Sequence, residues 1–232
     1  MQSQIILGDC FQELLKIPSK SVDLILTDPP YQISRKSNFT NNSDNKKFNN
    51  ISLEFGDWDK DELDIENLFK EFTRVLKVGG SLIIFYDIWK SKDLLQMANK
   101  YGLQQPRVCQ WVKTNPVPVN SKSNYLSNAI EFFFTFVKKG KPTFKSKYDK
   151  GIYEYPICHG KERTIHPTQK PLSLIKDILE KHSNENDVVL DCFAGSGTIG
   201  VACKELKRNY ILIEMGSDYY DIIMSRMNFM DS

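Results

Sequence analysis

Residues 188–200, with the sequence VVLDCFAGSGTIG, constrain the fold more than any other stretch of this chain. A short apolar run leads into Gly195, Gly197 and Gly200, which have the spacing G-x-G-x-x-G, and a helix-compatible segment follows. Glu214 stands fourteen residues past Gly200, at the end of the next apolar run. In such a strand–turn–helix unit the glycines let the backbone approach a nucleoside, and the later acid accepts hydrogen bonds from ribose hydroxyls. The stretch therefore predicts a nucleoside site in an α/β fold.

Apolar runs and helical spacing alternate along the rest of the chain. The expected strands are residues 5–7, 23–27, 81–86, 108–112, 130–137, 188–192 and 210–214. The expected helices are residues 61–77, 91–101, 172–182, 198–207 and 218–230. Asp61 and Glu62 are expected to begin the first helix, and Gly79 and Gly80 to end it. Continuous apolar runs are typical of buried strands, so we expect a largely parallel sheet with helices on both faces.

The order of the elements predicts a circular permutation. The 18 residues after Glu214 have the pattern of one helix, so the cofactor half lacks a third strand of its own. The N-terminal run QIILGDC is the available neighbour, and pairing it with YILIE (210–214) would place Asp9 at the ligand-binding edge of the sheet. The following strand ends in TDPPY, which includes Asp28. We therefore expect the cofactor half last and the reacting half first.

Length and composition favour one enzyme-sized domain. The 232 residues fit a single domain with a large core, and no apolar stretch reaches the roughly 18–20 residues of a membrane span. The N-terminus lacks the pattern of a signal peptide, so we expect a cytoplasmic protein. The five cysteines form no C-x-x-C pair, and His166, Cys158 and His159 lack a fourth ligand, so no metal is expected.

The charge is unevenly distributed. Residues 107–176 carry a net charge of +9, whereas residues 1–106 carry −2 and residues 177–232 carry −5. A basic middle third predicts a surface that contacts a polyanion. The polar, asparagine-rich stretch 34–50 follows TDPPY directly and is expected to form a loop over the site.

Three motifs, TDPPY, VLDCFAGSGT and HPTQKP (166–171), occur in this order and resemble the β-class of S-adenosylmethionine-dependent DNA amino-methyltransferases. The resemblance covers roughly residues 5–220 and implies a Rossmann-like methyltransferase fold, S-adenosylmethionine as cofactor, and no metal. It implies a single domain, 1–232, with a catalytic half (1–115), a target-recognition region (116–165) and a cofactor half (166–232). The implied cofactor contacts are Asp9, Cys10, Asp28, Thr168, Gln169, Lys170, Asp191, Phe193, Ala194, Gly195, Ser196, Gly197, Thr198 and Glu214.

The DPPY corner has a chemical interpretation of its own. An exocyclic amine is a poor nucleophile, because its lone pair is delocalised into the base ring. Asp28 supplies a carboxylate acceptor, and Pro29 supplies a carbonyl acceptor that Pro29 and Pro30 hold rigid, because proline fixes φ near −65°. Tyr31 can stack on a base that has left the duplex. No Pro-Cys pair occurs, so the cysteine nucleophile of C5-cytosine methylation is not indicated.

The basic third supplies the candidate DNA contacts. QWVKTNPVP (110–118) resembles a family segment beside the base pocket, with Trp111 either a pocket wall or a core residue. The residues predicted to contact DNA are Lys113, Asn115, Lys138, Lys139, Lys145 and Lys147. The expected partner is double-stranded DNA, and the short target-recognition region makes a homodimer, or a helper protein, plausible. A cognate restriction endonuclease is a further expected partner.

Several functions remain open at this point. An Asp-first tetrapeptide favours N6-adenine by association, with N4-cytosine the runner-up, since both amines fit the same acceptors. A dinucleotide-dependent oxidoreductase would explain the glycines but not DPPY or HPTQKP. A DNA-binding module without catalysis would not need Asp28, Tyr31, Gly195 and Glu214 intact. RNA or protein-glutamine methylation is less favoured, because related enzymes there usually begin the tetrapeptide with Asn.

Overall fold

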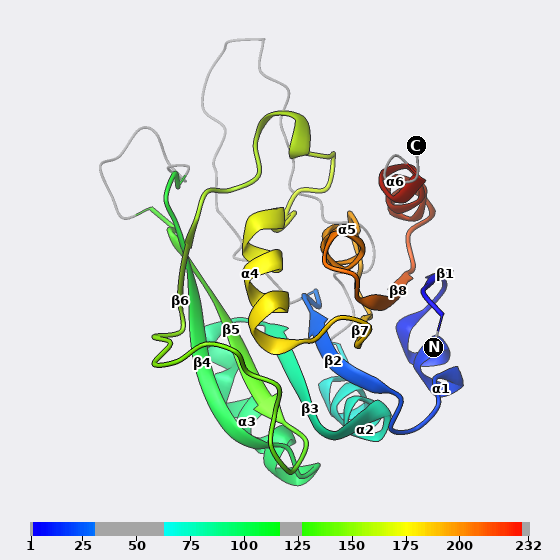
Figure 1. Cartoon of the computed structure of the whole chain (residues 1–232), viewed down its shortest axis with the longest axis vertical. Coiled ribbons are helices and arrows are strands. Elements are labelled where there is room, and N and C mark those ends of the chain that lie inside the picture. Colours follow the sequence, from blue (N-terminus) through cyan, green and yellow to red (C-terminus); the bar gives the residue numbers. More distant parts are fainter. Residues whose placement is uncertain (1, 31–62, 117–126, 229–232) are drawn as a thin grey trace, which may run out of the picture.

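The computed structural model describes residues 2–30, 63–116 and 127–228. Within these ranges the strands form one eight-stranded sheet in the order β1-β8-β7-β2-β3-β5-β4-β6 (Figure 1). Five of the strands are mutually parallel: β1 (Gln4–Leu7), β8 (Asn209–Glu214), β7 (Val188–Asp191), β2 (Val22–Thr27) and β3 (Leu76–Phe85). The remaining strands are β5 (Ile130–Val137), antiparallel to β3 and to β4 (Gln104–Lys113), and β6 (Ile152–Tyr155), parallel to β4.

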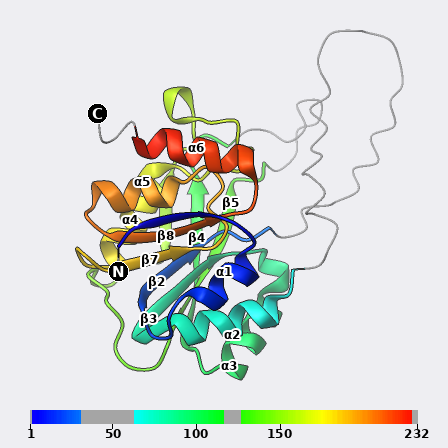
Figure 2. The same ribbon diagram turned by 90° about the vertical axis from the view of Figure 1, so that its right-hand side faces the viewer.

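Helices cover both faces of the sheet (Figure 2). One face carries α1 (Cys10–Lys16), α2 (Ile65–Val75) and α3 (Ser91–Lys100). The other carries α4 (Leu172–His182), α5 (Thr198–Glu205) and α6 (Ser217–Asn228). Two short 3-10 turns, η2 (Ile88–Lys90) and η3 (Gly160–Glu162), lie in the connections. The predicted layered α/β architecture is confirmed.

Strand β2 shows why its apolar residues form a continuous run. Leu24 and Leu26 pack among residues of α4 and α5, whereas Ile25 packs among residues of α1 and α2. All three side chains are fully buried, and each such side chain contributes about 1.5–3 kcal/mol relative to exposure. Because both faces of the sheet are covered, alternate side chains can all be apolar.

The predicted pairing of the N-terminal strand with β8 is confirmed. Leu7 stands opposite Glu214 in a parallel register, and the Gly8 amide donates to the Glu214 carbonyl at 2.9 Å. The C-terminal segment is a single helix, α6, as expected. The N-terminal strand therefore pairs with the strand nearest the C-terminus, which is the predicted permutation.

The first long helix ends earlier than the sequence predicts. Helix α2 ends at Val75, and Gly79 and Gly80 lie inside β3 instead of ending the helix. The reason is the pairing of Leu76 with Val22, which starts the sheet hydrogen bonds immediately after the helix. Asp64 caps the start of α2 by accepting from the Asn67 amide at 3.0 Å. The predicted starting residues, Asp61 and Glu62, lie outside the described residues.

Other departures concern short elements. Helix α1 and strand β6 were not predicted, because seven and four residues are too short for a clear period. The described part of the predicted target-recognition region, 116–165, contributes β5 and β6 to the main sheet. Stretch 34–50 lies outside the described residues. Within the described ranges no helix has the length and apolar character to cross a membrane.

Candidate active site

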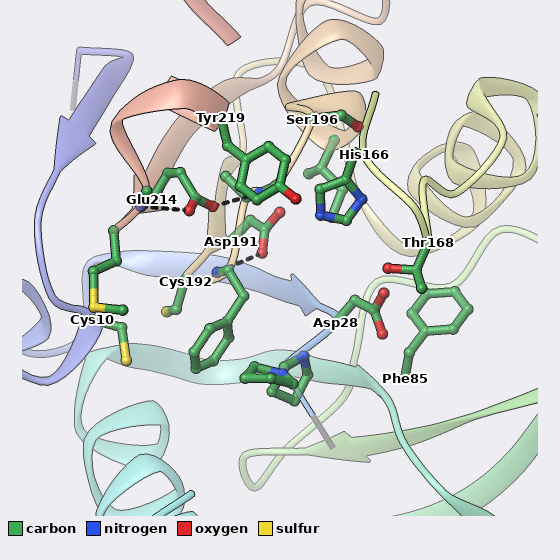
Figure 3. Close-up of a pocket in the computed structure, with 18 of the residues that line it drawn as sticks. Cys10, Asp28, Phe85, His166, Thr168, Asp191, Cys192, Ser196, Glu214 and Tyr219 are labelled. Carbon is green, nitrogen blue, oxygen red and sulfur yellow. Dashed lines mark hydrogen bonds between the residues drawn. The ribbon is translucent and has the colours of Figure 1, made fainter. Parts of the chain in front are cut away.

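A cavity of about 530 Å³ opens at the carboxyl edge of the parallel strands (Figure 3). Its size is typical of small-molecule sites, and this edge is where ligands bind in open α/β sheets. The walls come from the segments after β1, β2, β7 and β8, with the end of β3 and residues 166–170. Of the predicted cofactor and catalytic residues, the lining includes Asp9, Cys10, Asp28, Pro29, Pro30, Thr168, Gln169, Lys170, Asp191, Phe193, Ala194, Gly195, Ser196, Thr198 and Glu214.

The glycine loop is tied to β8 through one carboxylate. Glu214 accepts from the Gly195 amide at 2.7 Å with Oε2 and from the Gly216 amide at 2.8 Å with Oε1. Burial raises the pKa of Glu214, and hydrogen bonds from these backbone amides oppose the increase. Each carboxylate oxygen retains a second lone pair, so Glu214 can still accept from a ligand hydroxyl in the cavity.

The two glycines of this loop have different roles. Gly195 (φ +52°) lines the cavity, and a Cβ on it would lie 2.7 Å from His166 Nε2. Gly197 (φ +74°) is not among the lining residues, and a Cβ there would lie 3.0 Å from Cγ1 of Ile223 in α6. The sequence interpretation placed Gly197 against the ligand, but in the structure its missing side chain makes room for α6.

Asp191, at the end of β7, is almost completely buried, with 2% of its surface exposed. Its Oδ1 accepts from Thr27 Oγ1 at 2.8 Å and from the Phe193 amide at 3.1 Å. Burial raises the pKa of Asp191 to about 7, although these hydrogen bonds act in the opposite direction. Asp191 therefore joins the ends of β2 and β7 at the cavity floor.

Asp28 follows β2 and reaches the same cavity from the side opposite Glu214 (Figure 3). Its Oδ2 is ion-paired with Lys170, whereas its Oδ1 is buried and accepts no hydrogen bond from the described residues. Burial raises the pKa of Asp28; Lys170 lowers it and Glu131 raises it. Pro29 and Pro30 line the cavity beside Asp28. Tyr31 lies outside the described residues.

Cysteines at the cavity are not suited to nucleophilic attack. Cys10 and Cys192 line the cavity and, like the other three cysteines, are buried and free. Burial raises the pKa of Cys10 to about 12 and raises that of Cys192 well above its ordinary value. Both are therefore thiols rather than the reactive thiolates. Among the described residues, no group of three or more His, Cys, Asp or Glu side chains is arranged to hold a metal ion.

Comparison with known proteins identifies the family. A family model for N6/N4 methyltransferases, described as DNA methylase, matches residues 22–225, which is most of the chain. The chain belongs to the N6/N4 DNA methylase family. It is similar to the type II methyltransferase M.HinfI of Haemophilus influenzae, with 35% identity over 246 aligned residues that cover 96% of this chain and 67% of M.HinfI. It is also 29% identical to the type II methyltransferase M2.LlaDCHI of Lactococcus lactis subsp. cremoris, over 95% of this chain and 87% of that protein.

Solved structures of DNA methyltransferases are also similar to this chain. The M1.HpyAVI–SAM complex matches this DNA methylase with a TM-score of 0.73 and 29% identity, over 97% of this chain and 98% of that one. The cytosine-N4-specific PvuII DNA methyltransferase matches with a TM-score of 0.75 and 20% identity, over 97% and 86% of the two chains, which shows a shared fold. The β-class resemblance of the three motifs is thus confirmed.

The HPTQKP segment of this DNA methylase is organised by its own side chains. Gln169 is 5% exposed; its Oε1 accepts from the Thr164 amide at 2.8 Å and its Nε2 donates to the Glu162 carbonyl at 2.8 Å. His166 contacts the Tyr219 ring, with centroids 4.7 Å apart, and its buried Nδ1 makes no hydrogen bond to the described residues. Burial lowers the pKa of His166 to about 4, so the ring is neutral at pH 7. The predicted cofactor contact of Gln169 stays a prediction, although its amide is already engaged.

Four of the residues predicted to contact DNA lie away from the cavity. Lys138 donates to the Leu76 carbonyl at 2.7 Å, and Lys145 donates to the Ser183 carbonyl at 2.7 Å. Ser183 directly follows α4, and β5 ends at Val137 opposite Ser81, so that Lys138 reaches Leu76 at the start of β3. This group, with Lys139 and Lys147, therefore lies at the amino edge of the sheet. Strand β2, which separates the two edges, has six residues, roughly 20 Å. No contact within the protein tests whether these lysines bind DNA, but their place at the edge away from the cavity disfavours that sequence prediction.

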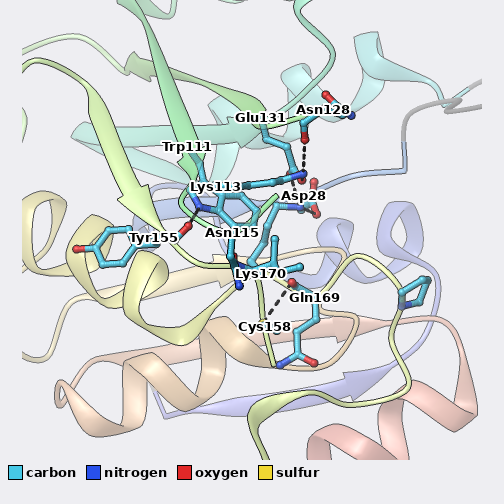
Figure 4. Close-up of polar contacts among 12 residues, drawn as sticks. Asp28, Trp111, Lys113, Asn115, Asn128, Glu131, Tyr155, Cys158, Gln169 and Lys170 are labelled. Carbon is cyan, nitrogen blue, oxygen red and sulfur yellow. Dashed lines mark hydrogen bonds and ion pairs between the residues drawn. The ribbon is translucent and has the colours of Figure 1, made fainter. Parts of the chain in front are cut away.

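Two further predicted DNA contacts are engaged within the protein. Lys113 pairs with Glu131 at 2.8 Å, and Asn115 accepts from the Ile157 amide at 2.7 Å (Figure 4). Trp111 is 2% exposed and donates to the Tyr155 carbonyl at 2.8 Å, so it is a core residue and not a cavity wall.

Sequence reasoning missed several residues of the site. Phe11, Phe85, Cys192, Met215 and Tyr219 line the cavity. Each lies within five residues of the carboxyl end of a parallel strand, which was the available signal. Glu131 was missed as well, although an acid inside the apolar strand IEFFFTFV was a visible anomaly.

Proposed function

We propose that this DNA methylase transfers a methyl group from S-adenosylmethionine to the N6 amine of an adenine in duplex DNA. One observation carries the proposal: Asp28 presents a buried carboxylate oxygen, Oδ1, without a hydrogen-bond partner among the described residues, in the cavity that also contains Glu214 and the glycine loop. A nucleoside cofactor and an amine acceptor can therefore meet in one enclosed space.

The cavity suits the cofactor. Glu214 and Asp9 offer acceptors for hydroxyl and amino groups, Phe193 offers an apolar wall, and Gly195 leaves the loop backbone accessible. Thr168 adds a hydroxyl on the side of residues 166–170. When bound, S-adenosylmethionine supplies a methyl group activated by its sulfonium. The solved M1.HpyAVI relative, described as a SAM complex, supports this cofactor.

Asp28 acts on the amine. Its Oδ1 accepts from one N–H and the Pro29 carbonyl accepts from the other, which draws the amine nitrogen toward a tetrahedral geometry and localises its lone pair. A charge-assisted hydrogen bond of this type contributes about 1.5–3 kcal/mol, and it assists catalysis to the extent that it strengthens in the transition state. We assign Tyr31 as the platform for the base, because stacking contributes about 1–3 kcal/mol.

The target base must leave the duplex to reach Asp28. Asp28 Oδ1 is buried, and a stacked, paired base cannot place its amine inside the cavity. Flipping costs a few kcal/mol, which stacking and the hydrogen bonds to Asp28 and Pro29 offset. We therefore infer base flipping for this enzyme.

Adenine is favoured over cytosine by the Asp that begins the DPPY tetrapeptide, and cytosine N4 is the second candidate. The relatives M.HinfI and M2.LlaDCHI are type II methyltransferases, which supports a place in a restriction-modification system with a cognate endonuclease. A homodimer on DNA is part of the same proposal. Membership of the family leaves a dinucleotide-dependent oxidoreductase without support.

The test is direct. Purified protein and S-adenosylmethionine are incubated with random-sequence DNA, the DNA is digested to nucleosides, and the modified nucleoside is identified by mass spectrometry. We expect N6-methyladenine; N4-methylcytosine would establish the second candidate. Asp28→Ala should abolish transfer while cofactor binding survives. DNA binding without transfer by the wild-type protein would indicate a DNA-binding module without catalysis.

A further inference from the structure

Four side chains of alternating charge form a chain that ends at Asp28 (Figure 4). Lys170 is ion-paired with Asp28 Oδ2 and lies 3.3 Å from Glu131 Oε2. Glu131 in turn pairs with Lys113 through Oε1 at 2.8 Å. The four residues come from the end of β2, strand β5, the segment before α4 and the end of β4, so only the folded sheet brings them together.

Lys170 is held firmly in this position. Its side chain is 8% exposed, and its ammonium lies 4.9 Å from the centre of the Phe85 ring, which also lines the cavity. Burying a charge is costly unless it is paired, so the two carboxylates and the ring stabilise the ammonium between Asp28 and Glu131. This arrangement directs the Lys170 charge toward the catalytic acid.

We propose that Lys170 is a positioning residue for Asp28, binding Oδ2 so that the carboxylate stays ionised and Oδ1 is left to accept from the target amine. The inference deepens the proposed function and rests on it. Glu131 shares Lys170 with Asp28 and adds a negative charge near the acid. The resemblance to the methyltransferase family also implies that Lys170 contacts the cofactor, and the pH profile of kcat and the cofactor affinity distinguish these two roles.

The charged surroundings set the direction of the pH effects. Lys170 and Glu131 act on the pKa of Asp28, and Asp28 in turn raises the pKa of Asp191. Lys113 is paired with Glu131, and His166, whose pKa Lys170 lowers, is neutral. Asp28 must be ionised to accept from the amine, so the rate falls as pH decreases through its pKa. Removing Lys170 removes the charge that lowers this pKa, and the acid limb of the kcat profile should move to higher pH. Neutralising Glu131 removes a charge that raises it, so the limb should move to lower pH.

The experiment compares Lys170→Met, Lys170→Arg and Glu131→Gln with wild type, with kcat measured across pH at saturating cofactor and DNA. Lys176→Met is the matched control, because it breaks an ion pair with Glu205 on the exposed side of α4. Cofactor dissociation constants are measured by calorimetry. We expect Lys170→Met to lower kcat at neutral pH by about tenfold or more, since misplacing a catalytic group by about 1 Å can cost a hundredfold. Lys170→Arg should keep the acid limb of the kcat profile at the wild-type pH. The control, Lys176→Met, should match wild type in kcat and in cofactor affinity.

Opposite displacements of the acid limb in Lys170→Met and Glu131→Gln would establish the positioning role. The signature is specific, because a merely structural defect would lower both rates without moving the limbs apart. If Lys170→Met does not fold, Glu131→Gln still tests the direction. Unmoved acid limbs, with a cofactor dissociation constant at least tenfold higher in Lys170→Met, would overturn the inference in favour of cofactor binding. Failure of the wild-type protein to methylate any DNA would overturn the proposed function instead.

Discussion

The carboxylate of Glu214 accepts a hydrogen bond from the Gly195 amide at 2.7 Å, which links the end of β8 to the glycine loop after β7. The second oxygen binds the Gly216 amide at 2.8 Å. The residue proposed to bind the cofactor ribose therefore also shapes the loop beside it. Loss of the side chain should affect both roles together.

Glu214→Ala should weaken cofactor binding by roughly tenfold to a hundredfold, because hydrogen bonds to a charged group contribute about 1.5–3 kcal/mol. Glu214→Gln should lose less, since it retains one oxygen acceptor. The measurement is isothermal titration with S-adenosylmethionine, and Glu205→Gln on the exposed side of α5 is the control. DNA affinity should be unchanged in all three variants. Unaltered cofactor affinity in Glu214→Ala would place the cofactor elsewhere.

Gly197→Ala should destabilise the fold more than it weakens cofactor binding. The residue has φ +74°, where a Cβ costs about 1–2 kcal/mol, and the new methyl group would press on Ile223 at 3.0 Å. Urea unfolding of Gly197→Ala, Ile223→Ala and the double variant separates the backbone cost of the positive φ from the cost of the contact with Ile223. The double variant should be less destabilised than the sum of the single variants, because removing Ile223 relieves the contact. Strict additivity would refute the packing role.

Asp191 should make the protein less stable as pH rises from about 4 to 7. Folding raises its pKa from 3.8 to about 7, so between these values the native state binds more protons than the unfolded state. The free energy of unfolding then falls with rising pH, and the contribution is complete below the unfolded pKa and lost above the folded one. Asp191→Asn removes this titration, yet keeps Oδ1 to accept from Thr27 and Phe193.

Urea unfolding at several pH values between 4 and 7.5 measures the effect. The stability of wild type relative to Asp191→Asn should decrease across this window by an amount on the order of a few kcal/mol. Asp28 and Glu214 are present in both proteins, so the comparison isolates the titration of Asp191 together with its coupling to these two acids. If the free energies of unfolding of the two proteins changed in parallel with pH, Asp191 would be ionised across this pH range.

The salt dependence of DNA binding should identify the edge that faces DNA. Lys161 and Arg163 are exposed in and beside η3, near the cavity, whereas Lys139 and Lys147 lie at the amino edge. Each phosphate contact contributes about −0.9 to the slope of log K against log salt. Because the base must reach Asp28, Lys161→Ala/Arg163→Ala should flatten the slope by up to about two units. Lys139→Ala/Lys147→Ala should leave it unchanged; the reverse result would place DNA on the basic stretch 138–147.

The sequence by itself determined the layered sheet, the permutation and the two loops that meet at the cavity. Each depends on a local signal: apolar runs mark buried strands, glycine spacing marks the turn after β7, and the carboxyl ends of parallel strands share one edge. The pairing of the N-terminal strand with β8 followed because the C-terminal part of the chain lacked a third strand of its own. Asp28 and Glu214 could therefore be assigned to one site without coordinates.

Only the tertiary structure decided which partners the side chains take. Lys170 binds Asp28 and Glu131, which lie 142 and 39 residues away along the chain, and no periodicity reports such contacts. Gly197 packs against Ile223 for the same reason, since the approach of α6 depends on how the sheet twists and packs. The basic residues 138–147 were assigned by composition, but β5 runs antiparallel to β3 and carries them to the edge away from Asp28. Charge and motif are local properties of the chain, whereas strand direction and register are set by the packing of the whole sheet.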